Sequence, residues 1–267
     1  MRFLFTALHP PAGGVAFGGV ASWIKTICKE FTARGHECVT MGPGYPAPEG
    51  RFDVGVLSNL KYTRRAARWC DSVLAVSHGI VDDEGPNERY RTVYTSEEVR
   101  DRWGGDGDVV RQPIDLDFWR EGGRERTDFV FYSYRAPETF ELEHVARRLG
   151  LNFVWLRAAS ADEARSALQS AALVAASGRA ALEAMACGAP TMICDWRDYN
   201  GGPLVCMDMD KAMRANYSGR GGVDPSTANM ERIAQETMAF QKPRERVETH
   251  HDSRIIASKL LDLCLQS

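Results

Sequence analysis

The chain has 267 residues, of which 44% are apolar and 26% charged, and its formal net charge is −3. This length and composition exclude a disordered or fibrous protein and predict one or two globular domains. The 33 basic side chains are nearly balanced by 36 acidic ones. The protein therefore has no overall positive charge to attract nucleic acid or an anionic membrane, and any contact with a polyanion depends on a local patch.

The seven cysteines contain no C-x-x-C pair, and several lie within apolar stretches. This usage predicts reduced, packed thiols rather than a disulfide or zinc framework.

The first apolar run is too short for a signal peptide. No stretch approaches the roughly 18 apolar residues of a membrane-spanning helix. We therefore expect a cytoplasmic protein.

The first half of the chain alternates short apolar runs with helical periodicity, which is typical of βα units on a parallel sheet. The apolar positions from Val20 to Phe31 recur with helical spacing and predict a helix that stops at Gly35. The other predicted strands and helices of this half follow in chain order: strands 2–8, 37–41, 53–57, 73–76 and 91–94, and helices 62–69 and 96–103.

Residues 111–127 break this rhythm with a proline, two glycines and a run of charges, which predicts a linker. The second half then repeats the alternation, with strands 129–132, 153–156, 172–176, 191–194 and 204–206, and helices 137–149, 161–169, 178–187, 230–240 and 253–263. We predict an α/β protein with two Rossmann-like parallel-sheet domains facing a cleft, residues 1–118 and 119–267, in which the final helix packs back on the first domain.

Two loops at strand ends carry candidate ligand-binding residues. In the first, Gly18 and Gly19 allow close approach of backbone N–H groups to a phosphate or a sugar, although a flexible turn explains them as well. In the second, Ser177, Gly178 and Arg179 open a helix whose N-terminus and guanidinium suit phosphate oxygens. Glu183 lies one turn further on. It is suited to a ribose diol, or it forms an i,i+4 pair with Arg179.

Four segments together resemble GT-B glycosyltransferases of the retaining family-4 type. GRAALEAMACGAP (178–190) is similar to the donor-site helix of that family, and the segment 18–43 is similar to its glycine loop, first helix and second strand. DSVLAVS (71–77) resembles the strand that ends in serine, and QPID (112–115) with Phe118 resembles the element between the domains. The segments occur in the family's order across most of the chain.

The resemblance implies roles for several residues. Glu183 would bind the nucleotide ribose, and Gly178 and Arg179 would lie near the diphosphate, whose charge Arg135 would neutralise as it leaves. The expected catalytic residues are Arg135, Arg179 and Glu183, and the expected donor-binding residues are Gly18, Gly19, Tyr134, Ser177, Gly178, Arg179 and Glu183.

The sequence also departs from the family pattern at three positions. Ala175 stands where the family has the first glutamate of an E-x7-E motif, which contacts the donor sugar. No counterpart is found for the lysine that follows the family's arginine. Leu57, Ser58 and Asn59 occupy the place of a histidine. These departures keep the activity and the identity of the donor open.

Candidates for the acceptor side come from the first half. Lys61, Arg64, Arg65 and Arg68 have the spacing of one helix face and form a basic stripe that suits phosphates, although a merely solvated face is the commoner explanation. His9 and His78 each follow an apolar run and are either catalytic or structural, and Ser58 and Asn59 follow another. No pattern predicts a metal site.

The predicted function is transfer of a sugar from a nucleoside diphosphate sugar to an acceptor hydroxyl, retaining and independent of metal, with no cofactor. Candidate acceptors are a glycan, a lipid, a small molecule or a hydroxymethylated DNA base, since the short domains are similar to those of small phage-encoded transferases. Two alternatives stay open, a non-catalytic GT-B module that binds a nucleotide or glycan, and a nucleotide-sugar epimerase.

Overall fold

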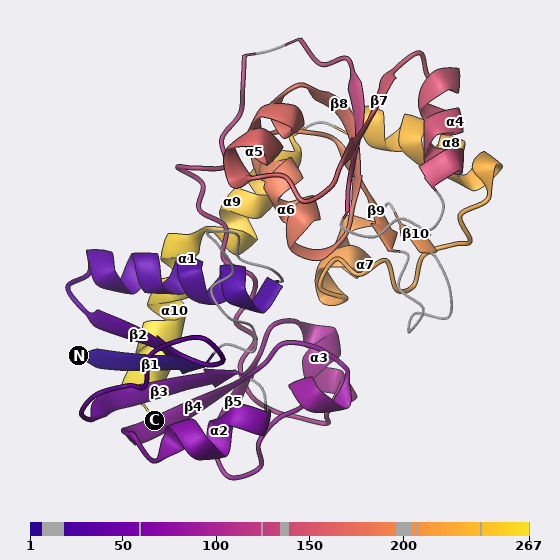
Figure 1. Ribbon diagram of the computed structural model, residues 1–267. Coiled ribbons are helices and arrows are strands. Elements are labelled where there is room, and N and C mark those ends of the chain that lie inside the picture. Colours follow the sequence, from indigo (N-terminus) through magenta and orange to yellow (C-terminus); the bar gives the residue numbers. More distant parts are fainter. Residues whose placement is uncertain are drawn as a thin grey trace. The chain divides into compact units, whose positions relative to one another are not determined.

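A computed structural model describes residues 1–6, 19–58, 60–123, 125–133, 139–195, 204–206, 208–240 and 242–266, without the side chains at 60–63, 83, 139–140 and 204. The chain divides into two compact units (Figure 1). Unit 1 comprises Met1–Pro113 together with His251–Ser267, and unit 2 comprises Ile114–His250. The sequence places this boundary at 118/119, a few residues later.

Unit 1 contains a five-stranded parallel sheet in the order β2-β1-β3-β4-β5. Its elements are β1 (Arg2–Thr6), α1 (Gly19–Ala33), β2 (Glu37–Met41), β3 (Phe52–Ser58), α2 (Leu60–Ala67), β4 (Cys70–Ser77), the 3₁₀ turn η1 (Asp82–Glu84), β5 (Arg91–Tyr94), α3 (Glu97–Arg102) and α10 (Ser253–Leu265).

Alternation along the strands sends side chains to opposite faces of this sheet. Phe3 and Phe5 of β1 belong to a core that includes Ile27 of α1 and Leu260 of α10. Leu4 belongs to a separate core beneath α2. The chain's last helix, α10, therefore completes the core of unit 1.

Unit 2 has the strand order β10-β9-β8-β6-β7. Its elements are β6 (Asp128–Tyr132), α4 (Thr139–Arg148), β7 (Asn152–Leu156), α5 (Ala161–Gln169), β8 (Ala171–Ala176), α6 (Gly178–Ala186), β9 (Thr191–Asp195), β10 (Leu204–Cys206), α7 (Met209–Arg214), α8 (Thr227–Met238) and α9 (Pro243–His251).

The sheet of unit 2 is also covered on both faces. Val130 and Val174 share a core with Leu182 of α6, whereas Phe131 shares another with Ile233 of α8. The last strand, β10, runs antiparallel to β9, whereas the other strand pairs of this sheet are parallel. Both units are thus α/β layers of the Rossmann type.

The predicted linker 111–127 is largely part of unit 2. Ile114, Leu116 and Trp119 are buried in the core that α5 and α6 share with the sheet. These apolar residues lie between charged ones, and burying them gains more than leaving them in a solvated linker. The boundary between the units, at 113/114, falls inside the predicted range, but the residues after it are packed in unit 2 rather than solvated.

Candidate functional site

The carboxyl ends of β6 and β8 meet in the middle of the sheet of unit 2. Tyr132 is the last residue of β6 and pairs in register with Ala176 of β8. Because β7 lies on one side of β6 and β8 on the other, the chain reverses its direction of winding at this point. Parallel α/β sheets bind ligands at such a switch point, outside the carboxyl ends of the strands.

Three side chains from two elements form a cluster here, which we call the β6–β8 cluster: Tyr132, Arg179 and Glu183. Arg179 Nε donates to Glu183 Oε1 at 2.9 Å, and the Tyr132 hydroxyl donates to Glu183 Oε2 at 3.2 Å. The Arg179 and Glu183 side chains are only 11% and 10% exposed. The i,i+4 pair that the sequence allows therefore forms, and it is buried rather than on the surface.

Burial dominates the electrostatics of this cluster. Burial raises the pKa of Glu183, while Arg179 and the Tyr132 hydroxyl oppose that shift by stabilising the carboxylate. Burial also raises the pKa of Tyr132, and the charge of Glu183 adds to the effect, so the phenol remains protonated and donates. Arg179 and Tyr132 donate to different oxygens of this carboxylate, and a carboxylate oxygen can accept more than one hydrogen bond.

The helix that carries Arg179 and Glu183 is fixed at both ends. At its start, Gly178 has φ +57° and donates its N–H to the carbonyl of Tyr217 at 2.6 Å. At its end, Arg126 and Arg244 donate to the carbonyls of Cys187 and Ala186. Cations at a helix C-terminus complement the dipole and satisfy the last carbonyls. These contacts hold the cluster in place.

Ser177 precedes this helix as its N-cap residue. Its backbone is extended, and its side chain makes no capping hydrogen bond. A capping serine normally satisfies one of the first N–H groups of a helix, and Ser160 of α5 does so by bonding the Glu163 N–H. Ser177 therefore does not cap the first turn of α6, and the positive end of this helix at the switch point suits an anion.

The carboxyl ends of β1, β3 and β4 in unit 1 bring together different chemistry. Thr6 Oγ1 donates to the carbonyl of Ser58 and accepts from its N–H, each at 2.7 Å. Ser58 Oγ lies 2.8 Å from His78 Nε2. All three residues are buried. The structure thus joins two predicted acceptor-side candidates, Ser58 and His78, in one neutral network.

His78 is held as a neutral imidazole. Burial lowers its pKa to about 3, and its ring packs edge-on against Trp23 with centroids 5.3 Å apart. Its Nδ1 has no hydrogen-bond partner in the described part of the chain. A histidine with this pKa does not act as a base of ordinary strength at neutral pH.

The basic stripe is only partly visible. Arg64 and Arg65 of α2 are exposed, and so is Arg68, which follows the end of this helix and stacks on Trp69. The side chain of Lys61 lies outside the described residues. So do His9, Gly18, Asn59, Tyr134 and Arg135. Gly19 is exposed at the first position of α1.

The position of Ala175 is informative. It is fully buried inside β8, in register with Phe131 and Met192, and belongs to the core beneath α4 and α8. A side chain at this position faces the interior, not the end of the strand. The contact to a donor sugar that the family makes with its first glutamate therefore has no place at residue 175.

Sequence reasoning missed Tyr132, which completes the β6–β8 cluster. The available signal was a polar aromatic residue at the end of the first strand of the second half.

Among the described residues, no three His, Cys, Asp or Glu side chains converge as metal ligands. None of the seven cysteines forms a disulfide. No helix in the described ranges combines the length and the apolar character that crossing a membrane requires.

Comparison with known proteins gives similarity at the level of structure. No protein-family model and no curated protein sequence matches the chain. Sucrose-phosphate synthase from Thermosynechococcus elongatus is similar with a TM-score of 0.60 and 13% identity, over 99% of this chain and 98% of that one. MurG from Acinetobacter baumannii is similar with a TM-score of 0.53 and 10% identity, over 100% and 99% of the two chains.

A third similar structure is a putative UDP-N-acetylglucosamine 2-epimerase from Listeria monocytogenes, with a TM-score of 0.55 and 9% identity, over 97% of this chain and 94% of that one. At these identities the likeness concerns the fold. With full coverage and two parallel-dominated sheets, it shows that the chain has a two-domain, Rossmann-like GT-B fold. The predicted fold class is confirmed.

Proposed function

We propose that this protein is a glycosyltransferase that moves a sugar from a nucleoside diphosphate sugar to an acceptor hydroxyl. The β6–β8 cluster carries the proposal. A buried carboxylate, a guanidinium and the N-terminus of a helix whose N-cap serine makes no capping bond lie together at the switch point of a GT-B domain. Such a set suits a ligand that combines hydroxyl donors with a diphosphate.

The contacts of Glu183 support a ribose-binding role. Its two oxygens are oriented by Arg179 and Tyr132, so the carboxylate does not need to be ordered when a ligand arrives. A ribose diol can donate to the same oxygens, because a carboxylate oxygen can accept more than one hydrogen bond. Preorganisation of this kind lowers the cost of binding.

The charge that develops in sugar transfer sits on the departing diphosphate. The positive end of the α6 dipole and the Arg179 guanidinium would stabilise it, each preorganised donor contributing roughly 3 kcal/mol. Arg135 is proposed for the same role on the ground of family resemblance. With cations in that role, we propose a retaining transfer that needs no metal or other cofactor.

Two other functions compete with sugar transfer. A nucleotide-sugar epimerase is suggested by the similarity to the Listeria protein, whose name specifies a UDP-sugar. A binding module without catalysis is suggested by Ala175, which leaves the family's sugar contact unfilled. Nucleoside diphosphate released only when acceptor is present distinguishes transfer from both, and analysis of the sugar product identifies epimerisation.

Binding is the first test, because the base and the sugar of the donor are unassigned. We would screen UDP, GDP, ADP, CMP and TDP and their sugars by thermal shift. A ligand at 100 times its Kd should raise the free energy of unfolding by about 2.7 kcal/mol. The ligand that stabilises the protein then becomes the probe for the variants. A complete lack of stabilisation counts against the proposal.

The decisive variant is Glu183→Gln, which keeps the size of the side chain and an acceptor for Tyr132. We expect at least a tenfold loss of nucleoside diphosphate affinity, about 1.4 kcal/mol, by calorimetry. Glu236→Gln is the matched control, since Arg232 and Glu236 form an i,i+4 pair of the same order on the exposed face of α8. Equal affinities of the two variants would remove Glu183 from the site.

The acceptor is proposed only by class: a glycan, a lipid, a small molecule or a hydroxymethylated DNA base. For DNA, the exposed cations Arg64, Arg65 and Arg68 are the relevant feature. Contacts with phosphates make affinity fall steeply as salt rises. A titration of duplex DNA at increasing NaCl tests this acceptor, and binding that salt does not weaken speaks against it.

A further inference from the structure

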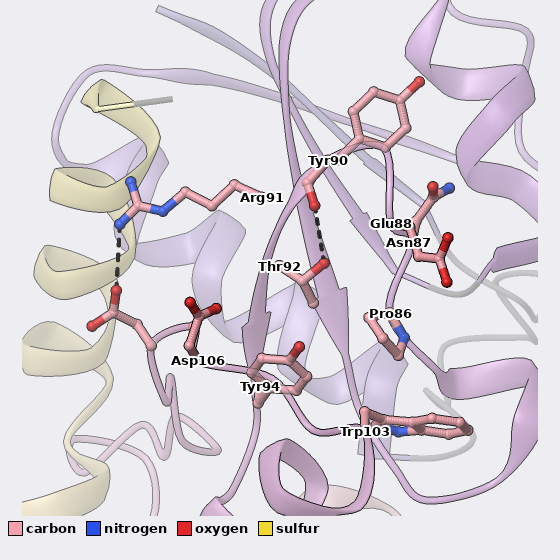
Figure 2. Close-up of a pocket in the computed structure, with 11 residues that line it drawn as sticks. Pro86, Asn87, Glu88, Tyr90, Arg91, Thr92, Tyr94, Trp103 and Asp106 are labelled. Carbon is pink, nitrogen blue, oxygen red and sulfur yellow. Dashed lines mark hydrogen bonds and ion pairs between the residues drawn. The ribbon is translucent and has the colours of Figure 1, made fainter.

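Unit 1 contains a cavity of about 460 Å³ beside its edge strand β5, which we call the β5 pocket. Figure 2 shows the residues that line it, from the segment before β5, from β5 itself, from the end of α3 and from the loop that follows. Strand β4 and the neutral end of β3 lie further into the sheet. Neither Ser58 nor His78 is among the residues that line the β5 pocket.

Three aromatic rings line the β5 pocket: Tyr90, Tyr94 and Trp103 (Figure 2). Trp103 is held in position because its Nε1 donates to the carbonyl of Gly79 at 2.9 Å. A Cβ at Gly85 would lie only 3.2 Å from the Trp103 ring, so the backbone packs closely against it. The fixed Trp103 ring offers apolar surface at little further entropy cost, and the two tyrosines add rings with polar tips.

The polar part of the lining is acidic. Arg91 is paired with Asp108 at 3.3 Å, and Lys259 of α10 approaches the same carboxylate. Glu88 and Asp106 are exposed, and within the described ranges neither has an ion-pair partner. The negative charge of Asp106 is felt at the Tyr94 hydroxyl, whose pKa is raised by burial first and by this charge second.

These charges decide which ligands the pocket accepts. Three carboxylates and one guanidinium line it, and two more cations lie beside the lining, Lys259 near Asp108 and Arg102 over the Trp103 ring. The β5 pocket therefore has no excess of positive charge that would attract a phosphate, a nucleic acid or an anionic lipid. Carboxylates accept hydrogen bonds from hydroxyl groups, and the buried amide of Asn87 adds a donor. Aromatic faces pack against the C–H side of a sugar ring. The volume falls in the range of small-molecule sites, roughly 300–1,000 Å³.

We propose that the β5 pocket binds a carbohydrate that carries no negative charge. Glu88 and Asp106 accept hydrogen bonds from its hydroxyl groups, and the rings of Tyr90 and Trp103 contact its apolar face. The proposal stands on the lining of this pocket and does not require the sugar transfer proposed above. An organic cation is the rival ligand, since aromatic rings and carboxylates attract it too.

The test uses the full chain and saturation-transfer NMR with a panel of probes. Glucose, galactose, mannose, N-acetylglucosamine and their short oligomers are the neutral sugars, tetramethylammonium is the cation and inorganic phosphate is the anion. We expect at least one neutral sugar to bind, with an affinity that is nearly the same at 50 and 500 mM NaCl because the ligand is uncharged.

The double variant Glu88→Gln, Asp106→Asn should weaken that sugar at least tenfold. Both side chains are exposed, so the fold is preserved, which circular dichroism checks. Glu49→Gln changes another exposed acid of unit 1, outside the pocket, and should bind as the wild type does. Tyr90→Ala gives an independent loss through the aromatic contact.

Three results overturn the proposal: no sugar of the panel binds, only tetramethylammonium binds and salt weakens it, or the double variant retains sugar affinity. Binding of nucleoside diphosphates is measured separately through Glu183→Gln. Failure of the β5 pocket and failure of the proposed transferase function are therefore distinguishable.

Discussion

The two sheets have the same strand order around their first strand, but they place their charged side chains at different ends of the strands. In each, the first strand lies between the second and the third, β1 between β2 and β3, and β6 between β7 and β8. Unit 1 carries exposed ion pairs at the start of its strands, such as Arg51 with Asp71, and a neutral Ser58–His78 contact at their end. Unit 2 buries an ion pair, Arg179 with Glu183, at the carboxyl end.

This difference shows what topology decides and what it leaves to the side chains. The shared strand order places a switch point in each unit. Whether charged side chains lie at that switch point depends on a few residues at the strand ends. A buried charge pair is expensive to desolvate and is weak evidence of stabilisation. Its presence at the switch point of unit 2 therefore favours a functional origin.

The largest expected effect concerns the buried pair. Glu183→Ala removes a buried carboxylate to which both Arg179 and Tyr132 donate, so we expect the free energy of unfolding to fall by about 3–5 kcal/mol, measured by urea denaturation. Glu236→Ala removes the same kind of i,i+4 pair from the surface and should cost at most about 1 kcal/mol. Similar losses in the two variants would contradict the contrast between buried and exposed pairs.

The double variant Arg179→Met, Glu183→Leu sharpens this test. This variant removes both charges together, and an apolar replacement of a buried ion pair is often close to neutral in stability. We expect it to be more stable than Glu183→Ala and to bind no nucleoside diphosphate. Recovery of stability without recovery of binding separates the two roles of the cluster.

The second effect concerns the neutral end of unit 1 and its pH dependence. The pKa of His78 is about 3 in the folded protein, below the ordinary value of about 6.5 expected after unfolding. As pH falls through this window, the unfolded chain takes up a proton that the folded protein does not. Stability is therefore present above pH 6.5 and is lost toward pH 3.

His78→Gln removes this proton uptake while keeping a polar group beside Ser58. Between pH 7 and pH 5 the wild type should lose about 2 kcal/mol more than the variant. His144→Gln, at an exposed histidine of α4, is the control and should follow the wild type. Parallel curves for wild type and His78→Gln would show that His78 is not buried in neutral form.

The sequence predicted most of the strands and helices, because their periodicity is local. It missed α9, PRERVETHH, in which the core residue Val247 stands among charged residues, and α7, which has only six residues. It also did not predict that β10 runs antiparallel to β9, because the alternation of apolar and polar residues along a strand does not show in which direction the strand runs. These features depend on contacts between distant parts of the chain.

In the candidate site, too, the contacts between residues close in sequence were predictable, and those between distant residues were not. The spacing of Arg179 and Glu183 allowed an i,i+4 pair, and the pair forms. The burial of this pair could not be predicted, because it depends on how α6 packs in the folded unit, where Tyr132, 51 residues away in sequence, donates to Glu183. The contact of Ser58 with His78 likewise joins the ends of two strands that pair only in the folded sheet.

The smallest expected effect concerns the exposed ion pair at the start of the strands of unit 1. Arg51 and Asp71 are 63% and 60% exposed, so water and salt screen their attraction. A double-mutant cycle of Arg51→Ala and Asp71→Ala should give a coupling below about 1 kcal/mol that shrinks further in 0.5 M NaCl. The same cycle on Arg179 and Glu183 should give a larger coupling that salt hardly changes, because the pair is buried. A salt-sensitive coupling at Arg179 and Glu183 would mean that solvent reaches the pair, and the contrast between the two sheets would be lost.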